Sequence, residues 1–222
     1  MTLASAKPGV PVVAGVAPLP AAAAQFVVVT PEVVDSIGHV LGNLFQRLYH
    51  LVDVSRTDGA AAGDDLVMAT RHLERFLRTA LDYLCPTTLT YQDMSVAEVV
   101  DGWRHQIGET TGGRVETEGA AQVPGVLRVD PAVLRHSFAL LASRLSPGAG
   151  APARLRASGG PGDRAVVVRA TLPPGAVGGA SSEREVEWAL AEKLIELQGG
   201  ALRELCGDQG GTTWEIVLPV QN

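Results

Sequence analysis

Apolar residues recur at alternating spacings of three and four between positions 34 and 51 of the chain. This spacing gathers them on one face of a helix in a heptad pattern. Thr30 can cap such a helix, and Pro31 and Glu32 suit its first turn because proline needs no donor there and a carboxylate favours the helix dipole. We expect a helix of about six turns, with a stripe broad enough for a four-helix bundle. The stripe consists of Val34, Ile37, Leu41, Leu44, Leu48 and Leu51.

One histidine lies on the polar side of this predicted helix. His39 takes an outward position in the heptad register, and Asn43 follows one turn later on the same face. A neutral imidazole is a competent nucleophile towards a phosphoryl group, and a neighbouring amide can bond the same group. We therefore select His39 and Asn43 as the candidate catalytic residues. The alternative is that both are ordinary exposed side chains of a scaffold helix.

A second stretch of helical periodicity follows a turn-rich segment at 55–63, and Pro86 ends it. Two long helices with a short connection form an antiparallel hairpin. Each helix carries more apolar surface than one partner can cover, which predicts that two copies pair as a homodimer. The second stripe consists of Leu66, Ala69, Leu73, Leu77, Ala80 and Leu84.

Past Pro86 the pattern changes to alternating strands and shorter helices. A capping-box pattern from Ser95 to Glu98 opens one helix, Asp130 and Pro131 open another, and a third is expected at 188–197. The fold class predicted from this order is α+β, with a helical hairpin followed by an α/β sandwich of helices on one face of a mixed sheet. Strands are expected at 89–94, 114–118, 124–129, 153–158, 164–172, 201–205 and 213–220.

The segment at 1–29 is apolar, but Pro11, Pro18 and Pro20 interrupt it. Such a run suits neither a secretion signal nor a membrane span. We interpret 1–29 as a flexible Ala/Pro linker, 30–86 as the dimerisation hairpin and 87–222 as the α/β domain. A cytoplasmic protein without membrane contact is the corresponding expectation.

The composition of the chain restricts the classes of partner and of bound group that we expect. The formal net charge is −6 and the chain has no block of basic residues, so we expect no nucleic acid partner. Cys85 and Cys206 stand apart without metal-ligand spacing, which predicts two buried thiols and neither a metal site nor a disulfide framework. The remaining histidines lack a catalytic neighbour and are expected at surface or interface positions: His50, His72, His105 and His136.

Four stretches in this order resemble the catalytic half of a bacterial sensor histidine kinase, which is a dimerising hairpin followed by a GHKL-type ATP-binding domain. They are the box HVLGNLF at 39–45, DPAVLR at 130–135, AEKLIELQGG at 191–200 and GGTTWEIVLP at 210–219. The resemblance implies a GHKL-like sandwich, His39 as the phosphoacceptor and a response-regulator receiver domain as partner.

The chain departs from this family where nucleotide would bind. The segment at 136–145 has no asparagine, the segment at 169–175 has no carboxylate, and the last helix opens with glutamates in place of a glycine-rich turn. Carboxylates at a helix N-terminus repel a polyphosphate. We therefore expect no ATP binding and no cofactor. Val40 also replaces the acidic residue that follows the family's histidine, which argues against ATP-dependent autokinase activity.

These observations leave three hypotheses. The leading one is a histidine phosphotransferase-like signalling protein that relays phosphoryl groups to or from a receiver through His39, without binding ATP. The alternative is a non-catalytic pseudo-histidine-kinase scaffold that binds a receiver or a kinase partner. A third is a GHKL-like ATPase or kinase with an aberrant pocket, against which Val40 and the glutamates of the last helix argue.

Overall fold

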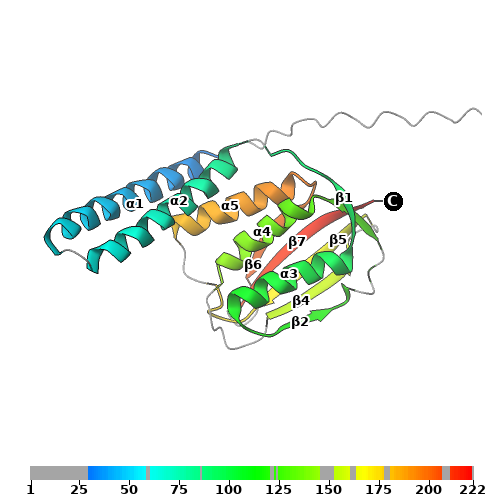
Figure 1. Cartoon of the computed structure of the whole chain (residues 1–222). Helices are drawn as coiled ribbons and strands as arrows, with labels where there is room; N and C mark the ends of the chain where they lie inside the picture. The colour runs from blue at the N-terminus through cyan, green and yellow to red at the C-terminus, as the bar shows by residue number, and fades with distance from the viewer. Residues whose placement is uncertain are drawn as a thin grey trace, which may run out of the picture.

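The hairpin predicted from the heptad pattern is the most elongated feature of the molecule (Figure 1). The computed structural model describes residues 30–58, 61–85, 87–120, 123, 125–145, 153–160, 164–177, 181–206 and 211–221. Helix α1 covers Pro31–Asp58 and helix α2 covers Ala61–Leu84. The turn expected at 55–63 is therefore wrong in its extent, because α1 continues to Asp58 and α2 starts at Ala61, where alanines favour the helix.

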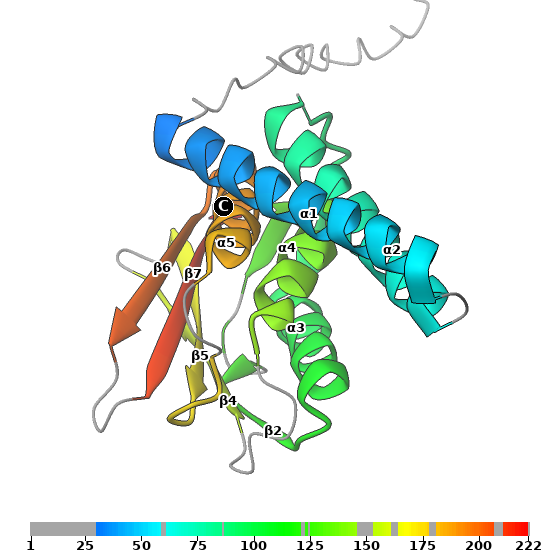
Figure 2. The ribbon, with the colours of Figure 1, turned by 90° about the vertical axis from the view of Figure 1, so that its left-hand side faces the viewer.

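Seven strands in the described residues form one sheet, and three helices cover one of its faces (Figures 1 and 2). The strand order is β1-β3-β7-β5-β4-β2, with β6 paired to β7, and only the β2–β4 pair is parallel among these. The α+β fold class, with a hairpin before a GHKL-like sandwich, is confirmed. The elements are β1 Gln92–Ser95, α3 Val96–Thr111, β2 Val115–Glu118, β3 Val126–Val129, α4 Pro131–Ser143, β4 Ala153–Gly159, β5 Ala165–Leu172, α5 Ser182–Glu196, β6 Ala201–Cys206 and β7 Thr212–Gln221.

Local capping explains where these helices start. Ser95 and Glu98 form the predicted capping box of α3, and the Asp130 carboxylate accepts hydrogen bonds from two backbone amides at the start of α4. The prediction for α5 is wrong, because the helix starts at Ser182 rather than at 188, with Ser181 accepting from the Arg184 amide. The first turn of α5 carries glutamates instead of apolar residues, so hydrophobic periodicity did not reveal it.

Helix α5 connects the two parts of the molecule. It packs against α4 and β6 and also against both hairpin helices, and Figure 2 shows the hairpin lying across it. Leu190 and Ile195 of α5 are fully buried, in one continuous core with Val40 of α1 and Phe76 of α2. Hairpin and sheet domain therefore share one hydrophobic core.

A buried lysine reinforces this junction. The Lys193 side chain is 6% exposed, and its ammonium donates to the backbone carbonyl oxygens of Asp82, Tyr83 and Cys85, at 3.4 Å for Asp82 and 2.9 Å for Cys85. Carbonyls at the end of a helix have no partner within the helix, so Lys193 supplies the donors that the end of α2 lacks. Burial lowers the pKa of Lys193 from its ordinary value.

The apolar stripe of α2 is only partly covered within one chain, and one expectation, that for Cys85, is wrong. Leu77 and Leu84 remain 37% and 46% exposed, whereas Phe76 and Tyr83 are buried. The reason is that α5 packs on the side of α2 that carries Phe76 and Tyr83, and that no described element covers the opposite side. Cys85 is exposed rather than buried because it follows the last turn of α2, and the Cys206 side chain lies outside the described part of the structure.

The contacts of Lys193 generate a stability prediction. Replacement Lys193→Met keeps a long side chain but leaves the carbonyls at the end of α2 without donors. We expect a loss of about 1–3 kcal/mol in the free energy of unfolding, measured by urea denaturation. The matched control is Arg78→Met on the exposed face of α2, whose ion pair with Glu74 is 3.4 Å long and solvent-exposed, so its loss should cost less than about 1 kcal/mol. Equal losses in the two variants would contradict the capping role.

Candidate functional site

The structure brings the two candidate catalytic residues together on the outer side of α1. His39 and Asn43 are both exposed, and the Asn43 amide nitrogen lies 3.2 Å from His39 Nε2. An amide nitrogen can only donate, so this contact requires the tautomer in which Nε2 is the acceptor and Nδ1 carries the ring proton. An electrophile that reacts with the Nε2 lone pair must then displace the Asn43 amide from it.

The surface next to His39 is open. Gly38 and Gly42 flank the histidine, and a Cβ atom placed on either would meet no heavy atom within 4 Å. Glycine inside a helix costs about 1 kcal/mol relative to alanine, so two glycines here are not explained by packing within the chain. Because Gly38 and Gly42 have no side chains, the helix backbone beside His39 is open to close approach.

The segments that follow α4 and β5 meet each other in the folded chain. Leu145 after α4 forms a β-bridge with Val177 after β5, and Leu145, Leu172 and Ala176 are buried. A cavity of about 10 Å³ lies beside them, which is at the lower limit for one water molecule. Its other lining residues come from the end of α3 and from the segments that lead into β2 and β4, so this cavity lies away from the start of α5.

Arg144 occupies the end of α4 in the same region. Its guanidinium lies 4.6 Å from the ring centre of Trp188 and 5.9 Å from that of Trp214, which is a cation–π arrangement. Burial lowers the pKa of Arg144, partly offset by the charges of Glu204 and Glu187. The Trp214 side chain is fully buried and packs in the core.

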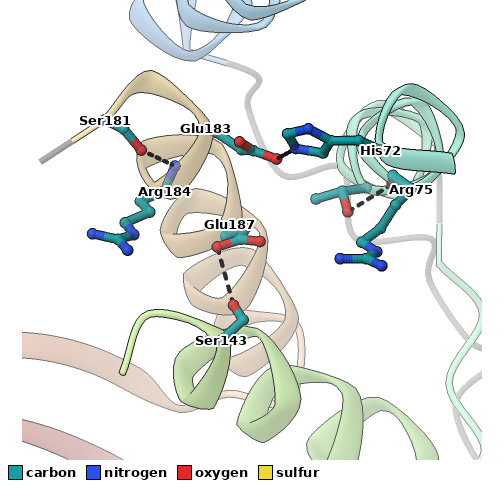
Figure 3. Close-up of polar contacts among 8 residues, drawn as sticks. His72, Arg75, Ser143, Ser181, Glu183, Arg184 and Glu187 are labelled. Atoms are coloured by element: carbon teal, nitrogen blue, oxygen red, sulfur yellow. Dashed lines mark hydrogen bonds and ion pairs between the residues drawn. The ribbon is translucent and has the colours of Figure 1, made fainter. Parts of the chain in front are cut away.

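The glutamates at the start of α5 each contact a different element, and Figure 3 shows the contacts of Glu183 and Glu187. Glu183 Oε1 lies 2.6 Å from His72 Nε2 of α2, Glu185 Oε2 accepts from Ser36 of α1 at 3.0 Å, and Glu187 Oε2 accepts from Ser143 of α4 at 3.0 Å. Sequence reasoning assigned these carboxylates to the helix dipole and missed their partners. The expected interface position of His72 is confirmed by its contact with Glu183.

Burial raises the pKa of Glu187, against the opposing effect of the Ser143 hydrogen bond. The folded protein therefore holds this proton more tightly than the unfolded chain does. The contribution of Glu187 to stability is then most favourable at acidic pH and declines as the pH rises from the unfolded value of 4.5 through the raised folded pKa.

Comparisons with known proteins agree with the fold. No family model matches the chain, and no curated protein matches it in sequence. Among solved structures, the histidine kinase AdeS of Acinetobacter baumannii has a TM-score of 0.53 and 11% identity over 85% of this chain and 98% of its own. Full-length ShkA, in complex with AMPPNP, has a TM-score of 0.53 and 14% identity over 87% of this chain and 47% of its own.

The histidine kinase ThkA, in complex with the response regulator protein TrrA, gives a TM-score of 0.62 with 13% identity over 86% of this chain and 62% of ThkA. Identities this low establish the fold and not the activity. The chain therefore shares the fold of these histidine kinase structures, a helical hairpin followed by a GHKL-like domain. No helix in the described ranges combines the length and apolar character needed to cross a bilayer.

The raised pKa of Glu187 generates a prediction on pH. Glu187→Gln removes the ionisable group while preserving the acceptor for Ser143. We expect the stability of wild type relative to this variant to fall as the pH increases above 4.5, measured by urea unfolding at several pH values. Glu118→Gln in exposed β2 is the control and should leave the pH profile unchanged. A relative stability of wild type that rises over this range would contradict the assignment.

Proposed function

We propose that this protein is a histidine phosphotransferase-like member of a two-component pathway, in which His39 exchanges a phosphoryl group with an aspartate of a response-regulator receiver domain. The observation that carries the proposal is the exposed His39–Asn43 pair on an open face of the hairpin, in a histidine-kinase fold. A cytoplasmic location is part of the same proposal.

The transfer step requires few groups. The Nε2 lone pair of His39 attacks the phosphorus of an aspartyl phosphate, a P–N bond forms, and the P–O bond breaks with its electron pair leaving on the aspartate carboxylate. The Nδ1 proton is retained in the phosphoimidazole. Asn43, which contacts Nε2 in the resting protein, would turn its amide towards a phosphoryl oxygen and stabilise the developing charge.

The donor in this proposal is the receiver and not ATP. The sequence supports this choice, since the segment at 136–145 has no asparagine and the segment at 169–175 has no carboxylate, which are the nucleotide-binding groups that the family resemblance would require there. The glutamates at the start of α5 add negative charge where a polyphosphate would need donors. The complex of ThkA with TrrA supports a receiver as partner, because ThkA shares the hairpin to which we assign docking.

Phosphotransfer is tested by mixing the full chain with receiver domains labelled on their aspartate. Wild type should acquire an acid-labile label and His39→Gln should acquire none. Asn43→Ala should be labelled about tenfold more slowly, because it loses a hydrogen bond to a charged group. His50→Gln, an exposed histidine on the same helix, is the matched control and should behave as wild type.

The same assay separates the alternatives. With labelled Mg-ATP and no receiver, wild type should remain unlabelled, and a label that depends on His39 would establish an autokinase instead. If no phosphorylated receiver labels the chain, His39 does not act as a relay. The non-catalytic scaffold that binds a receiver or kinase partner is then the remaining hypothesis.

We also propose that two copies pair through the hairpin. Helical spacing places its exposed apolar side chains on the side that α5 leaves open, flanking the seam between α1 and α2. Burying one leucine contributes about 1.5–3 kcal/mol, so a stripe of this size can hold a dimer together. The stripe consists of Val34, Phe45, Tyr49, Leu77, Leu81 and Leu84, which are 37% to 71% exposed.

Leu81→Glu tests this dimer, because it introduces a charge at the centre of the stripe, where Leu81 is 57% exposed. We expect wild type to sediment as a dimer at micromolar concentration and the variant to dissociate at least about tenfold more readily. Leu205→Glu in β6, a residue 40% exposed and far from the hairpin in sequence, is the control and should remain dimeric. A monomeric wild type would refute the proposed pairing.

A further inference from the structure

A groove of about 370 Å³ lies on the hairpin, and His39 is not among its lining residues. It is lined by Arg47 of α1 and by Met68, Ala69, Arg71, His72 and Arg75 of α2. Figure 3 shows His72 and Arg75 beside the start of α5. Arg47 follows His39 by eight residues, about 12 Å along the helix, so the groove does not include the phosphoacceptor.

The charges in this groove are uncompensated. None of the guanidinium groups of Arg47, Arg71 and Arg75 has a hydrogen bond or ion pair with any residue in the described ranges, whereas Arg78 one turn further along α2 pairs with Glu74. Like charges held close together repel each other unless an anion joins them. The three arginines that line this groove have no such anion among the described residues.

One carboxylate of the chain itself contacts a residue that lines the groove. Glu183 Oε1 lies 2.6 Å from His72 Nε2, with about one third of each side chain exposed. This contact shows that an anionic oxygen fits against His72. It supplies one negative charge, which leaves an excess of positive charge from the three arginines.

We propose that this groove binds a small oligophosphate anion, which competes with Glu183 for His72. Guanidinium groups match the oxygens of phosphate in pairs, and three of them balance an anion that carries three or more charges. The volume lies in the range of small-molecule sites. The lining has no tryptophan, tyrosine or phenylalanine on which a nucleobase could stack, so the ligand class is an oligophosphate without a nucleoside.

Occupancy of the groove is coupled to the junction between α2 and α5. An oligophosphate that binds His72 displaces Glu183 from it. The hydrogen bond between Ser36 and Glu185 and the contacts of Lys193 with the end of α2 are retained. The ligand therefore loosens the start of α5 without detaching the helix. This makes the groove a regulatory site that operates whether or not His39 is phosphorylated.

Calorimetric titration of the full chain with inorganic tripolyphosphate tests the site. Wild type should bind one anion per chain, and Arg71→Gln and Arg75→Gln should each weaken binding about tenfold or more, as expected for losing a charged hydrogen bond. Glu183→Gln should strengthen binding severalfold, because it removes the competing carboxylate. Arg78→Gln is the matched control for net charge and should bind within about twofold of wild type, since exposed charges outside the groove are screened.

Other outcomes would overturn the proposal. If Arg78→Gln weakens binding as much as Arg71→Gln, or if Glu183→Gln weakens it, attraction is non-specific and the groove is not a site. Phosphatidylcholine vesicles containing phosphatidic acid serve as the lipid arm, and cosedimentation that requires Arg75 without tripolyphosphate binding would assign the groove to a membrane headgroup instead. His39→Gln should bind tripolyphosphate as wild type does, which keeps this test independent of the phosphotransfer assay.

Discussion

The burial of α5 between the sheet and the hairpin is the interaction on which the rest of the structure depends. Fully burying each large aliphatic side chain contributes about 1.5–3 kcal/mol, and Leu190 and Ile195 are both inaccessible to solvent. Lys193 on the same helix supplies donors to the end of α2. Because α5 covers one side of the hairpin, the opposite stripe and the outer edge that carries His39 remain uncovered by it.

The same helix relates the proposed lack of ATP binding to the architecture of the junction between hairpin and sheet domain. A helix start that holds a phosphate needs unpaired amides and little negative charge. Here that turn holds carboxylates, and Glu183, Glu185 and Glu187 contact α2, α1 and α4 respectively. The residues that are unfavourable for a polyphosphate are thus the residues that join the helices, and Glu183 also faces the arginine groove.

Features governed by neighbours in sequence could be predicted. The capping box at Ser95, the cap at Asp130 and both hairpin helices follow from local hydrogen bonding and periodicity. The start of α5 was missed because its first turn is polar, and its contacts replace the apolar pattern on which helix prediction depends. The exposure of Cys85 was also missed, because the usual burial of a free cysteine does not reveal which elements cover its position.

The sequence alone determined that His39 and Asn43 share a face, since residues four apart in a helix lie one turn apart whatever surrounds them. It also determined the α+β fold class from the change of period after Pro86. Only the tertiary structure decided that His72 meets Glu183 across 111 positions, and that Arg47 joins Arg71 in one groove. The physical reason is that such contacts depend on how helices pack against each other, which local periodicity does not specify.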